Sequence, residues 1–305
     1  MCTAIYDNKY GHFFGRTLDL ERCFGETVAR IRRGDALQFI HSGECICNYS
    51  IIGMALSVKQ QLLFYDAVNE KGLCAAALNF PKFAVYHEKK QGALCLASFE
   101  VIPYLLSQYS NVSDTVDALK NAVITRDDFS QELKSTPLHW MIADKERAVV
   151  LESVSDGLKI YDNPTGVMTN SPPFPYHALR LCDYASLSPE HPKNSFLPSN
   201  LLTPYSRGLG AIGLPGDFSS SSRFIRATYA REHTLTPPHS NEDSRRRAAR
   251  RRIFDILSTV SLPYGIVRTE SGEPIYTVYT SCIDLTNGEY CYFTHNDRDI
   301  KVFKF

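Results

Sequence analysis

The chain has 305 residues, of which 44% are hydrophobic, so it can bury the core of one large domain or two ordinary ones. Its 33 basic and 33 acidic residues balance, which argues against nucleic acid or an anionic membrane surface as the main partner. No apolar run reaches about 18 residues and the first residues lack the charged and apolar regions of a signal peptide, so we expect neither a membrane span nor such a signal.

The first elements in chain order are two predicted strands, at residues 2–6 and 11–16. The turn-forming run Asp7-Asn8-Lys9 would join them as a hairpin that brings Arg16 and Asp19 back near Cys2. Three more strands are predicted at residues 26–33, 49–58 and 73–78. Two helices follow at residues 99–109 and 114–123, the second with Ser113 as its N-cap and Asp114 and Asp117 in its first turn.

The second half of the chain begins with strands again, at residues 138–143, 147–154, 157–161 and 166–169. A helix is predicted at 174–185, and the following segment, 186–215, is rich in Pro, Ser, Asn and Gly without any period. Such long irregular segments are usually functional or mobile. The last elements are helices at 222–232 and 242–260 and strands at 275–284, 289–295 and 300–304.

This order indicates an α+β fold in which helices lie outside packed, mainly antiparallel sheets. The C-terminal strands are expected to complete a sheet, and we therefore expect residues 1–305 to form a single domain.

The nine cysteines are scattered and odd in number, a pattern typical of reduced thiols in the cytoplasm. Cys45 and Cys47 form a CxC pair, but no second pair or histidine cluster completes a zinc site. His87 and Glu88 also lack further ligands. We therefore expect no metal and no cofactor.

Cys2 is the first candidate for chemistry, because methionine is usually trimmed when the next side chain is small. Removal of Met1 would give Cys2 a free α-amine, whose ordinary pKa is near 7.7–8.0, beside a thiol with an ordinary pKa near 8.5. One residue would then carry both nucleophile and base. From its position alone, an ordinary buried thiol near the chain terminus is the better interpretation.

Seven further motifs change that balance, because they stand in one order along the chain. They are Phe14-Gly15-Arg16-Thr17-Leu18-Asp19, Asn69-Glu70-Lys71-Gly72-Leu73, Ala77-Leu78-Asn79-Phe80-Pro81, Leu138-His139-Trp140-Met141, Thr169-Asn170-Ser171-Pro172, Gly213-Leu214-Pro215-Gly216-Asp217-Phe218 and Ser222-Arg223-Phe224. Together with Met1-Cys2-Thr3, this set resembles the conjugated bile acid hydrolases of the choloylglycine hydrolase family, over essentially the whole chain. The resemblance implies an N-terminal-nucleophile hydrolase with a four-layer αββα fold. It also implies hydrolysis of the amide between a steroid acyl group and glycine or taurine.

The resemblance assigns a role to each polar residue of these motifs. Cys2 would be the nucleophile, Arg16 would favour its thiolate, and Asp19 would orient the α-amine. The resemblance places Asn79 in the oxyanion hole, and Asn170 and Arg223 in the polar network around Cys2. Without it, the two asparagines would be turns that cap strands and Arg223 would be a solvated helix arginine, whereas the place of Arg16 just before a tight turn beside Cys2 already favours a role near the thiol.

Four other residues are candidates for binding substrate. Leu18, Phe24 and Tyr65 flank the polar set, where the family builds an apolar steroid pocket, although they could equally be ordinary core. Arg207 lies in the irregular segment, which the resemblance places at the mouth of the site. Members with Ser-Arg there resemble one another in favouring taurine conjugates.

Two alternative functions stay open. One is a penicillin V acylase, a related branch that tends to carry tyrosine where this chain has Asn79; the other is a non-catalytic protein that binds an apolar ligand.

The runs Arg245-Arg246-Arg247 and Arg250-Arg251-Arg252 are typical of a nucleic-acid-binding segment, but we expect them on the solvated side of a helix. Trp140 is expected in the core. The resemblance further implies a homotetramer in the cytoplasm of a gut bacterium.

Overall fold

The computed structural model describes residues 1–59 and 61–305. Most strands of this part of the chain lie in two sheets of seven strands each. The first sheet, in spatial order, comprises β14 (Val167–Met168), β1 (Cys2–Asp7), β2 (Phe13–Leu20), β16 (Pro274–Asp284), β17 (Glu289–Thr294) and β18 (Lys301–Lys304), with β15 (Val267–Arg268) beside β16. The second comprises β13 (Gly157–Asp162), β12 (Ala148–Val154), β11 (Leu138–Ala143), β8 (Cys74–Asn79), β7 (Gln61–Asn69), β6 (Ile51–Val58) and β3 (Thr27–Ile31).

Every strand pairing within these two sheets is antiparallel. Two short pairs lie outside them. They are the hairpin of β4 (Ala36–Phe39) and β5 (Gly43–Ile46), and the parallel pair β9 (Leu94–Ala97) and β10 (Ala122–Thr125).

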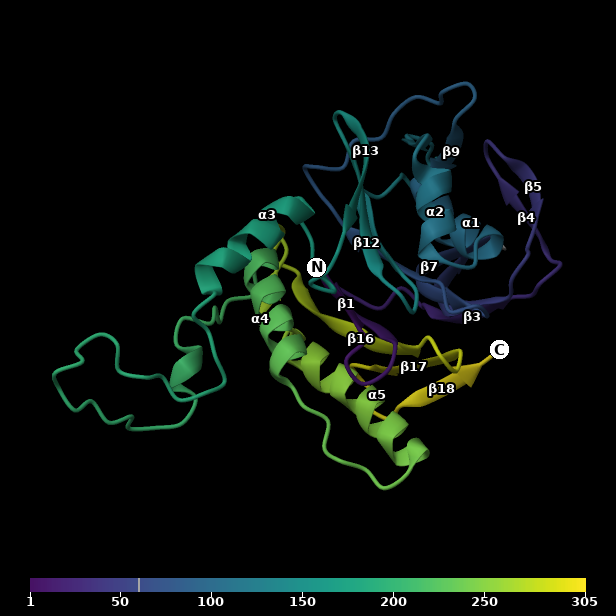
Figure 1. Cartoon of the computed structure of the whole chain (residues 1–305). Coiled ribbons are helices and arrows are strands. Elements are labelled where there is room, and N and C mark those ends of the chain that lie inside the picture. The colour runs from purple at the N-terminus through teal and green to yellow at the C-terminus, as the bar shows by residue number, and fades with distance from the viewer. Residues whose placement is uncertain (60) are drawn as a thin grey trace.

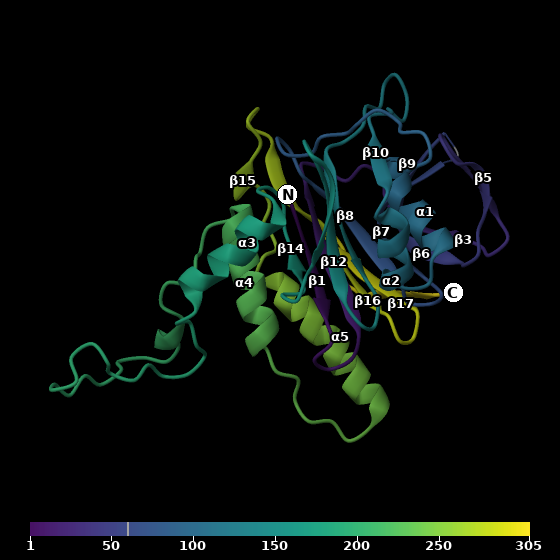
Figure 2. The same ribbon diagram turned by 45° about the horizontal axis from the view of Figure 1, so that its top comes forward.

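Helices cover the outer faces of both sheets (Figures 1 and 2). α4 (Ser220–His233) and α5 (Glu242–Ser258) pack on the first sheet, while α1 (Val101–Gln108) and α2 (Val112–Leu119) lie on the side of the second. A shorter helix, α3 (Phe174–Arg180), follows β14 of the first sheet in the chain and precedes the segment that leads to α4. The predicted four-layer αββα fold is therefore confirmed.

Two clusters of apolar side chains hold the layers together. The larger one joins both sheets to α4 and α5, and the smaller one lies between the second sheet and α1. Trp140 is fully buried in the smaller cluster, as predicted. Gly15 is required where α5 crosses β2, because a Cβ at that position would lie 2.9 Å from Cγ2 of Ile253 and 2.8 Å from the carbonyl oxygen of Ser281.

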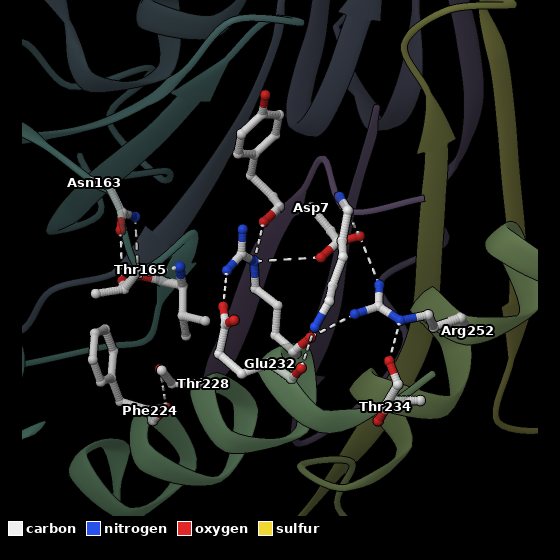
Figure 3. A network of polar contacts seen from close by, with 12 residues as sticks. Asp7, Asn163, Thr165, Phe224, Thr228, Glu232, Thr234 and Arg252 are labelled. Atoms are coloured by element: carbon white, nitrogen blue, oxygen red, sulfur yellow. Dashed lines mark hydrogen bonds and ion pairs between the residues drawn. The ribbon is translucent and has the colours of Figure 1, made fainter. Parts of the chain in front are cut away.

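A buried ion pair fastens the β1–β2 hairpin to the two helices (Figure 3). Asp7, at the end of β1, accepts a hydrogen bond of 2.6 Å from Nη1 of Arg252 on α5 and lies 3.6 Å from Nε of Arg231 on α4. Arg252 also donates to the carbonyl oxygens of Arg231 and Thr234. One carboxylate thus links the first strand to both outer helices.

Several sequence-based predictions are wrong in detail. The second predicted helix ends at Leu119 and begins after Asn111, whose side chain, rather than that of Ser113, caps it by accepting from the Asp114 N–H at 2.9 Å. Residues 122–125 form β10 instead of continuing that helix. The sequence also did not predict β4, β5, β7, β9 or the short β15.

The arginine run on α5 also differs from the prediction, because only part of it is solvated. Arg252 is buried against Asp7, and Arg246 and Arg250 form ion pairs with the buried Glu289 of β17. Arg245, Arg247 and Arg251 are exposed, and Arg245 pairs with Glu242 one turn away.

Residues 186–208 extend away from both sheets, at the left of Figure 1. The ends of this segment are tied together, since the Ser188 N–H donates to the carbonyl oxygen of Gly210 at 2.9 Å. We call residues 186–208 the arm.

All nine cysteines are free thiols. Within the residues that the structure describes, no helix is both long and apolar enough to cross a bilayer. The same residues hold no group of three potential metal ligands.

Candidate active site

The β1–β2 hairpin places Cys2 opposite Leu18 and Ala4 opposite Arg16. Arg16 and Leu18 alternate with Thr17 and Asp19 along β2, so the two pairs face opposite sides of the first sheet. Arg16 and Leu18 face the second sheet, because Arg16 contacts carbonyl oxygens of β7 and β8. Asp19 therefore faces the helix side.

A β-bulge in β16 directs side chains of that strand to both faces of the first sheet. Asp19 pairs with Thr277 and Leu18 with Tyr279, which leaves Val278 as an extra residue. In a regular strand Thr277 and Tyr279 would face the same side, but the extra residue turns them apart. The Thr277 hydroxyl donates to Oδ1 of Asp19 at 2.7 Å, while the Tyr279 hydroxyl donates to Asp66 in the opposite sheet.

The backbone of Cys2 is held by residues that come from distant parts of the chain. Its N–H donates to Oδ1 of Asn170 at 2.8 Å. Arg223, in the first turn of α4, donates to the carbonyl oxygen of Cys2 and, at 2.7 Å, to the same Oδ1 of Asn170. The Asn170 amide donates in turn to the carbonyl oxygen of Asn79 at 2.8 Å. The network therefore holds the backbone of Cys2 at both its nitrogen and its carbonyl oxygen.

Asp19 is fully buried and lies near Arg223 of this network, whose charge acts on its carboxylate. Its Oδ2 accepts from the Thr17 hydroxyl at 3.3 Å, in addition to the Thr277 bond. Burial raises the pKa of Asp19, opposed by the positive charges of Arg223 and of the chain's N-terminal amine. Met1 continues the ladder, because the Asp19 N–H donates to its carbonyl oxygen at 2.9 Å.

Arg16 is held on the opposite side of the sheet. Its Nη1 donates to the carbonyl oxygens of Tyr65 at 2.8 Å and Ala77 at 3.0 Å. Tyr65 is the extra residue of a second bulge, in β7, and its carbonyl is free to accept this bond. Burial lowers the pKa of Arg16, but Tyr279, Cys2 and Asp66 raise it by more, so that the guanidinium stays charged.

A cavity of about 340 Å³ opens above Cys2 between the two sheets. Cys2, Arg16 and Asn79 belong to the polar part of its wall, which also includes Glu21, Ser98, Lys134, Ser135 and Thr136. Leu18, Phe24 and Tyr65 belong to its apolar part, together with Phe99, Phe129 and Leu133. The thiol is only 2% exposed, so a substrate must enter this cavity to reach it.

The sequence of the chain matches the family described as linear amide C–N hydrolases, choloylglycine hydrolase family, over residues 2–305. The chain belongs to the choloylglycine hydrolase family. It is therefore an amide C–N hydrolase by family.

Several relatives of this choloylglycine hydrolase family member cover nearly all of it. It is similar to the bile salt hydrolase/transferase of Lactiplantibacillus plantarum, with 40% identity over 98% of this chain and 91% of that protein. It is 33% identical to the conjugated bile acid hydrolase of Lactobacillus gasseri, over 100% of this chain and 96% of the relative.

Two solved structures are similar to this one. A variant of the conjugated bile acid hydrolase from Clostridium perfringens superimposes with a TM-score of 0.89 at 31% identity, covering 100% of this chain and 92% of that one. A penicillin V acylase from Agrobacterium tumefaciens has a TM-score of 0.74 at 19% identity, covering 100% and 86%, and shares the fold.

The structure brings nine of the ten sequence-predicted site residues together in this family member. Arg207 is the exception: it is exposed on the arm and does not line the cavity. In the single chain the arm closes on itself at Ser188 and Gly210 and extends away from the sheets, so Arg207 lies away from the cavity.

Sequence reasoning did not identify Asp66 or Thr277, which contact this site. Asp66 is the one carboxylate in the otherwise mostly apolar strand β7. A charged residue in such a strand is a signal that could have identified Asp66 from the sequence. Thr277 had no comparable signal, because its role depends on a bulge.

A second cavity, of about 490 Å³, lies between the β4–β5 hairpin and α1. It is larger, but none of the predicted polar residues lines it. The chemistry of the thiol, arginine and amides therefore belongs to the smaller cavity.

Proposed function

We propose that this protein hydrolyses the amide bond of conjugated bile salts and releases the free bile acid and glycine or taurine. The observation that supports it most is the position of Cys2 at the end of an apolar cavity, with Arg16 and Asn79 beside it in the wall. A steroid acyl group is apolar and its amide is polar, so the cavity suits both parts. The relatives named as bile salt hydrolases over nearly the whole chain add support.

The proposed mechanism begins with removal of Met1. The α-amine of Cys2, held by Asn170 and near Asp19, would take the thiol proton while Sγ attacks the amide carbon. The Asn79 amide would donate to the oxyanion that forms. Breaking of the C–N bond transfers the proton from the amine to the leaving nitrogen and leaves a thioester on Cys2. Water then attacks the thioester, with the amine again carrying the proton.

Two alternatives have less support. The penicillin V acylase branch tends to carry tyrosine where this chain has Asn79, and the similarity to the solved acylase is one of fold. A non-catalytic binding protein would have no need for Asn170 to hold the nitrogen of Cys2 while Arg223 holds its carbonyl oxygen. Release of amino acid from taurocholate and glycocholate, with penicillin V as a third substrate, tests the choice; turnover of penicillin V alone would reject the proposal.

We also propose that taurine conjugates are favoured, through Arg207. Taurine ends in a sulfonate and reaches one backbone atom further than glycine, so a mobile guanidinium could meet it. Arginine also binds the carboxylate of a glycine conjugate well. The longer reach of taurine, and not its charge, must therefore distinguish the two conjugates. Because Arg207 does not line the cavity of its own chain, the arm would have to move or reach a neighbouring copy.

The expected result is a higher kcat/KM for taurocholate than for glycocholate, by several-fold, corresponding to about 1 kcal/mol from one partly exposed ion contact. Arg207→Gly should narrow this ratio, whereas Arg245→Gly, at an exposed arginine on α5, should not. Equal kcat/KM values in wild type, unchanged in Arg207→Gly, would reject this role.

We propose a homotetramer, and the arm supports it. Phe196, Leu201 and Tyr205 are 90%, 95% and 87% exposed, an arrangement that monomeric proteins rarely hold in water. Light scattering should give four times the chain mass for the wild type. Replacing all three residues by serine should lower that mass, whereas Leu235→Ser, at a 70% exposed site outside the arm, should leave it unchanged. A monomeric wild type would contradict the proposal.

We further propose that residues 1–305 act as one domain, since β16 and β17 lie in the same sheet as β1 and β2. A cytoplasmic location in a gut bacterium is the last part of the proposal. The free cysteines support the cytoplasm, and the resemblance supports the source.

A further inference from the structure

Asp66 is a fully buried carboxylate that reaches across the space between the two sheets. It lies on β7 of the second sheet, yet its hydrogen-bond donors come from the first. Oδ1 accepts from the Tyr279 hydroxyl of β16, and Oδ2 accepts from Ser281 of β16 at 2.8 Å and Tyr290 of β17 at 2.9 Å. Three donors on one carboxylate stabilise its charged form.

Arg16 lies near this carboxylate on one side and near Cys2 on the other. Tyr279, the Cys2 thiol and Asp66 are the neighbours whose charges act most strongly on the guanidinium, besides its burial. The Tyr279 ring is 6.0 Å from Cζ of Arg16, while its hydroxyl binds Asp66. Nη1 of Arg16 binds the carbonyl of Tyr65, the residue before Asp66. Arg16 and Asp66 are therefore linked twice, through Tyr279 and through the backbone at Tyr65, and we call these four residues the framework.

A buried guanidinium needs a nearby negative charge, because burial disfavours an isolated ion. The thiol of Cys2 carries a full charge only as thiolate, so it cannot supply this charge throughout a reaction cycle. Asp66 can supply this negative charge. Burial raises the pKa of Asp66, but Arg16 and the three hydroxyl donors oppose that rise. The Nη2 of Arg16 has no hydrogen-bond partner in the described part of the chain. It can therefore donate to a group inside the cavity, whose wall includes Arg16.

We infer that Asp66 is a positioning residue that holds Arg16 in place and offsets part of its charge, and thereby sets how strongly Arg16 stabilises the Cys2 thiolate. This inference rests on the proposed role of Cys2 as the nucleophile. Ionisable groups lie around both charged residues of this framework. Cys2, Tyr65, Asp19, Tyr279 and Tyr290 surround Arg16, and Cys74 of β8 lies near Asp66.

The test is the pH dependence of iodoacetamide alkylation at Cys2, measured in the full chain after loss of Met1. Mass spectrometry of the N-terminal peptide separates Cys2 from the other eight cysteines. Asp66→Asn removes the negative charge at nearly constant volume, and the field of Arg16 at the sulfur is then less compensated. We expect the alkylation midpoint to move to lower pH by about one unit, and kcat/KM for taurocholate to fall about tenfold.

Ser281→Ala gives a second, milder test, because it removes one of the three donors that stabilise the charged form of Asp66. The pKa of Asp66 then rises further and its charge on Arg16 weakens, so the midpoint should move in the same direction as in Asp66→Asn, to lower pH, and by less. This variant also serves if Asp66→Asn does not fold. The matched control is Asp144→Asn, which alters a buried carboxylate that binds the Val112 N–H outside this network and should leave the midpoint unchanged.

An unchanged midpoint in Asp66→Asn with a lower melting temperature would overturn the inference and leave Asp66 a purely structural residue. An unchanged midpoint in Ser281→Ala would overturn it as well. Alkylation needs no substrate, so the result is separate from the proposed function. A wild type that does not hydrolyse bile salts would defeat the proposed function, while shifts to lower pH in both variants, larger in Asp66→Asn, would still support Asp66.

Discussion

Replacing Cys2 by serine is expected to lower kcat for taurocholate by roughly 10⁴-fold or more, in the range found when a nucleophile is removed. A hydroxyl is far less acidic than a thiol, and the weak α-amine cannot activate it well. Arg16, whose place in the cavity wall suits stabilisation of a thiolate, would have no anion to stabilise. The measurement is single-turnover and steady-state release of taurine by purified protein of known N-terminal mass.

Two controls separate the nucleophile from other thiols. Cys182→Ser, at an exposed cysteine outside the cavity, should keep full activity. A variant that retains Met1 should be as inactive as Cys2→Ser, because the nitrogen of Cys2 is then an amide and cannot carry a proton. Near-wild-type kcat in Cys2→Ser would defeat the assignment of Cys2.

Removing the Asp7 carboxylate is expected to cause the largest loss of stability. Asp7→Ala leaves Arg252, with a side chain 2% exposed, as an uncompensated buried charge, and breaking such a pair from one side costs about 3–5 kcal/mol. The hairpin that carries Cys2 and Arg16 would lose its link to α4 and α5 (Figure 3). Urea unfolding followed by circular dichroism gives the free energy of unfolding.

Glu242→Ala breaks the exposed ion pair with Arg245 on the same helix and should cost less than about 1 kcal/mol. The double variant Asp7→Ala/Arg252→Met should be more stable than Asp7→Ala alone, because it removes the unpaired charge. An Asp7→Ala protein as stable as Glu242→Ala would show that the pair contributes little.

Local patterns predicted the parts of this fold that depend on neighbouring residues. The turn at Asp7-Asn8-Lys9 and the apolar alternation around it sufficed for the β1–β2 hairpin, and with it for the approach of Arg16 and Asp19 to Cys2. The meeting of Asn170 and Arg223 at Cys2 came from the family resemblance, since no local pattern relates residues 168 and 221 positions apart.

What the sequence did not predict depends on contacts between distant segments. Arg252 reads as a solvated helix residue, because its partner Asp7 lies 245 positions away. β7 contains Asp66 and a bulge at Tyr65, which interrupt its apolar period. Arg207 could not be placed, because the position of the arm follows from how its ends are tied together and not from the residues within it.

The position of β16 beside β2 determines when the site can exist during synthesis. Thr277 and Asp19 are 258 positions apart, so a ribosome adding about 5–20 residues per second needs roughly 10–50 s to proceed from one to the other. Throughout that interval the hairpin with Cys2 has an unpaired edge, and Asp66 lacks all three of its hydroxyl donors, which lie on β16 and β17. The nascent chain therefore cannot assemble this site until its last strands leave the ribosome.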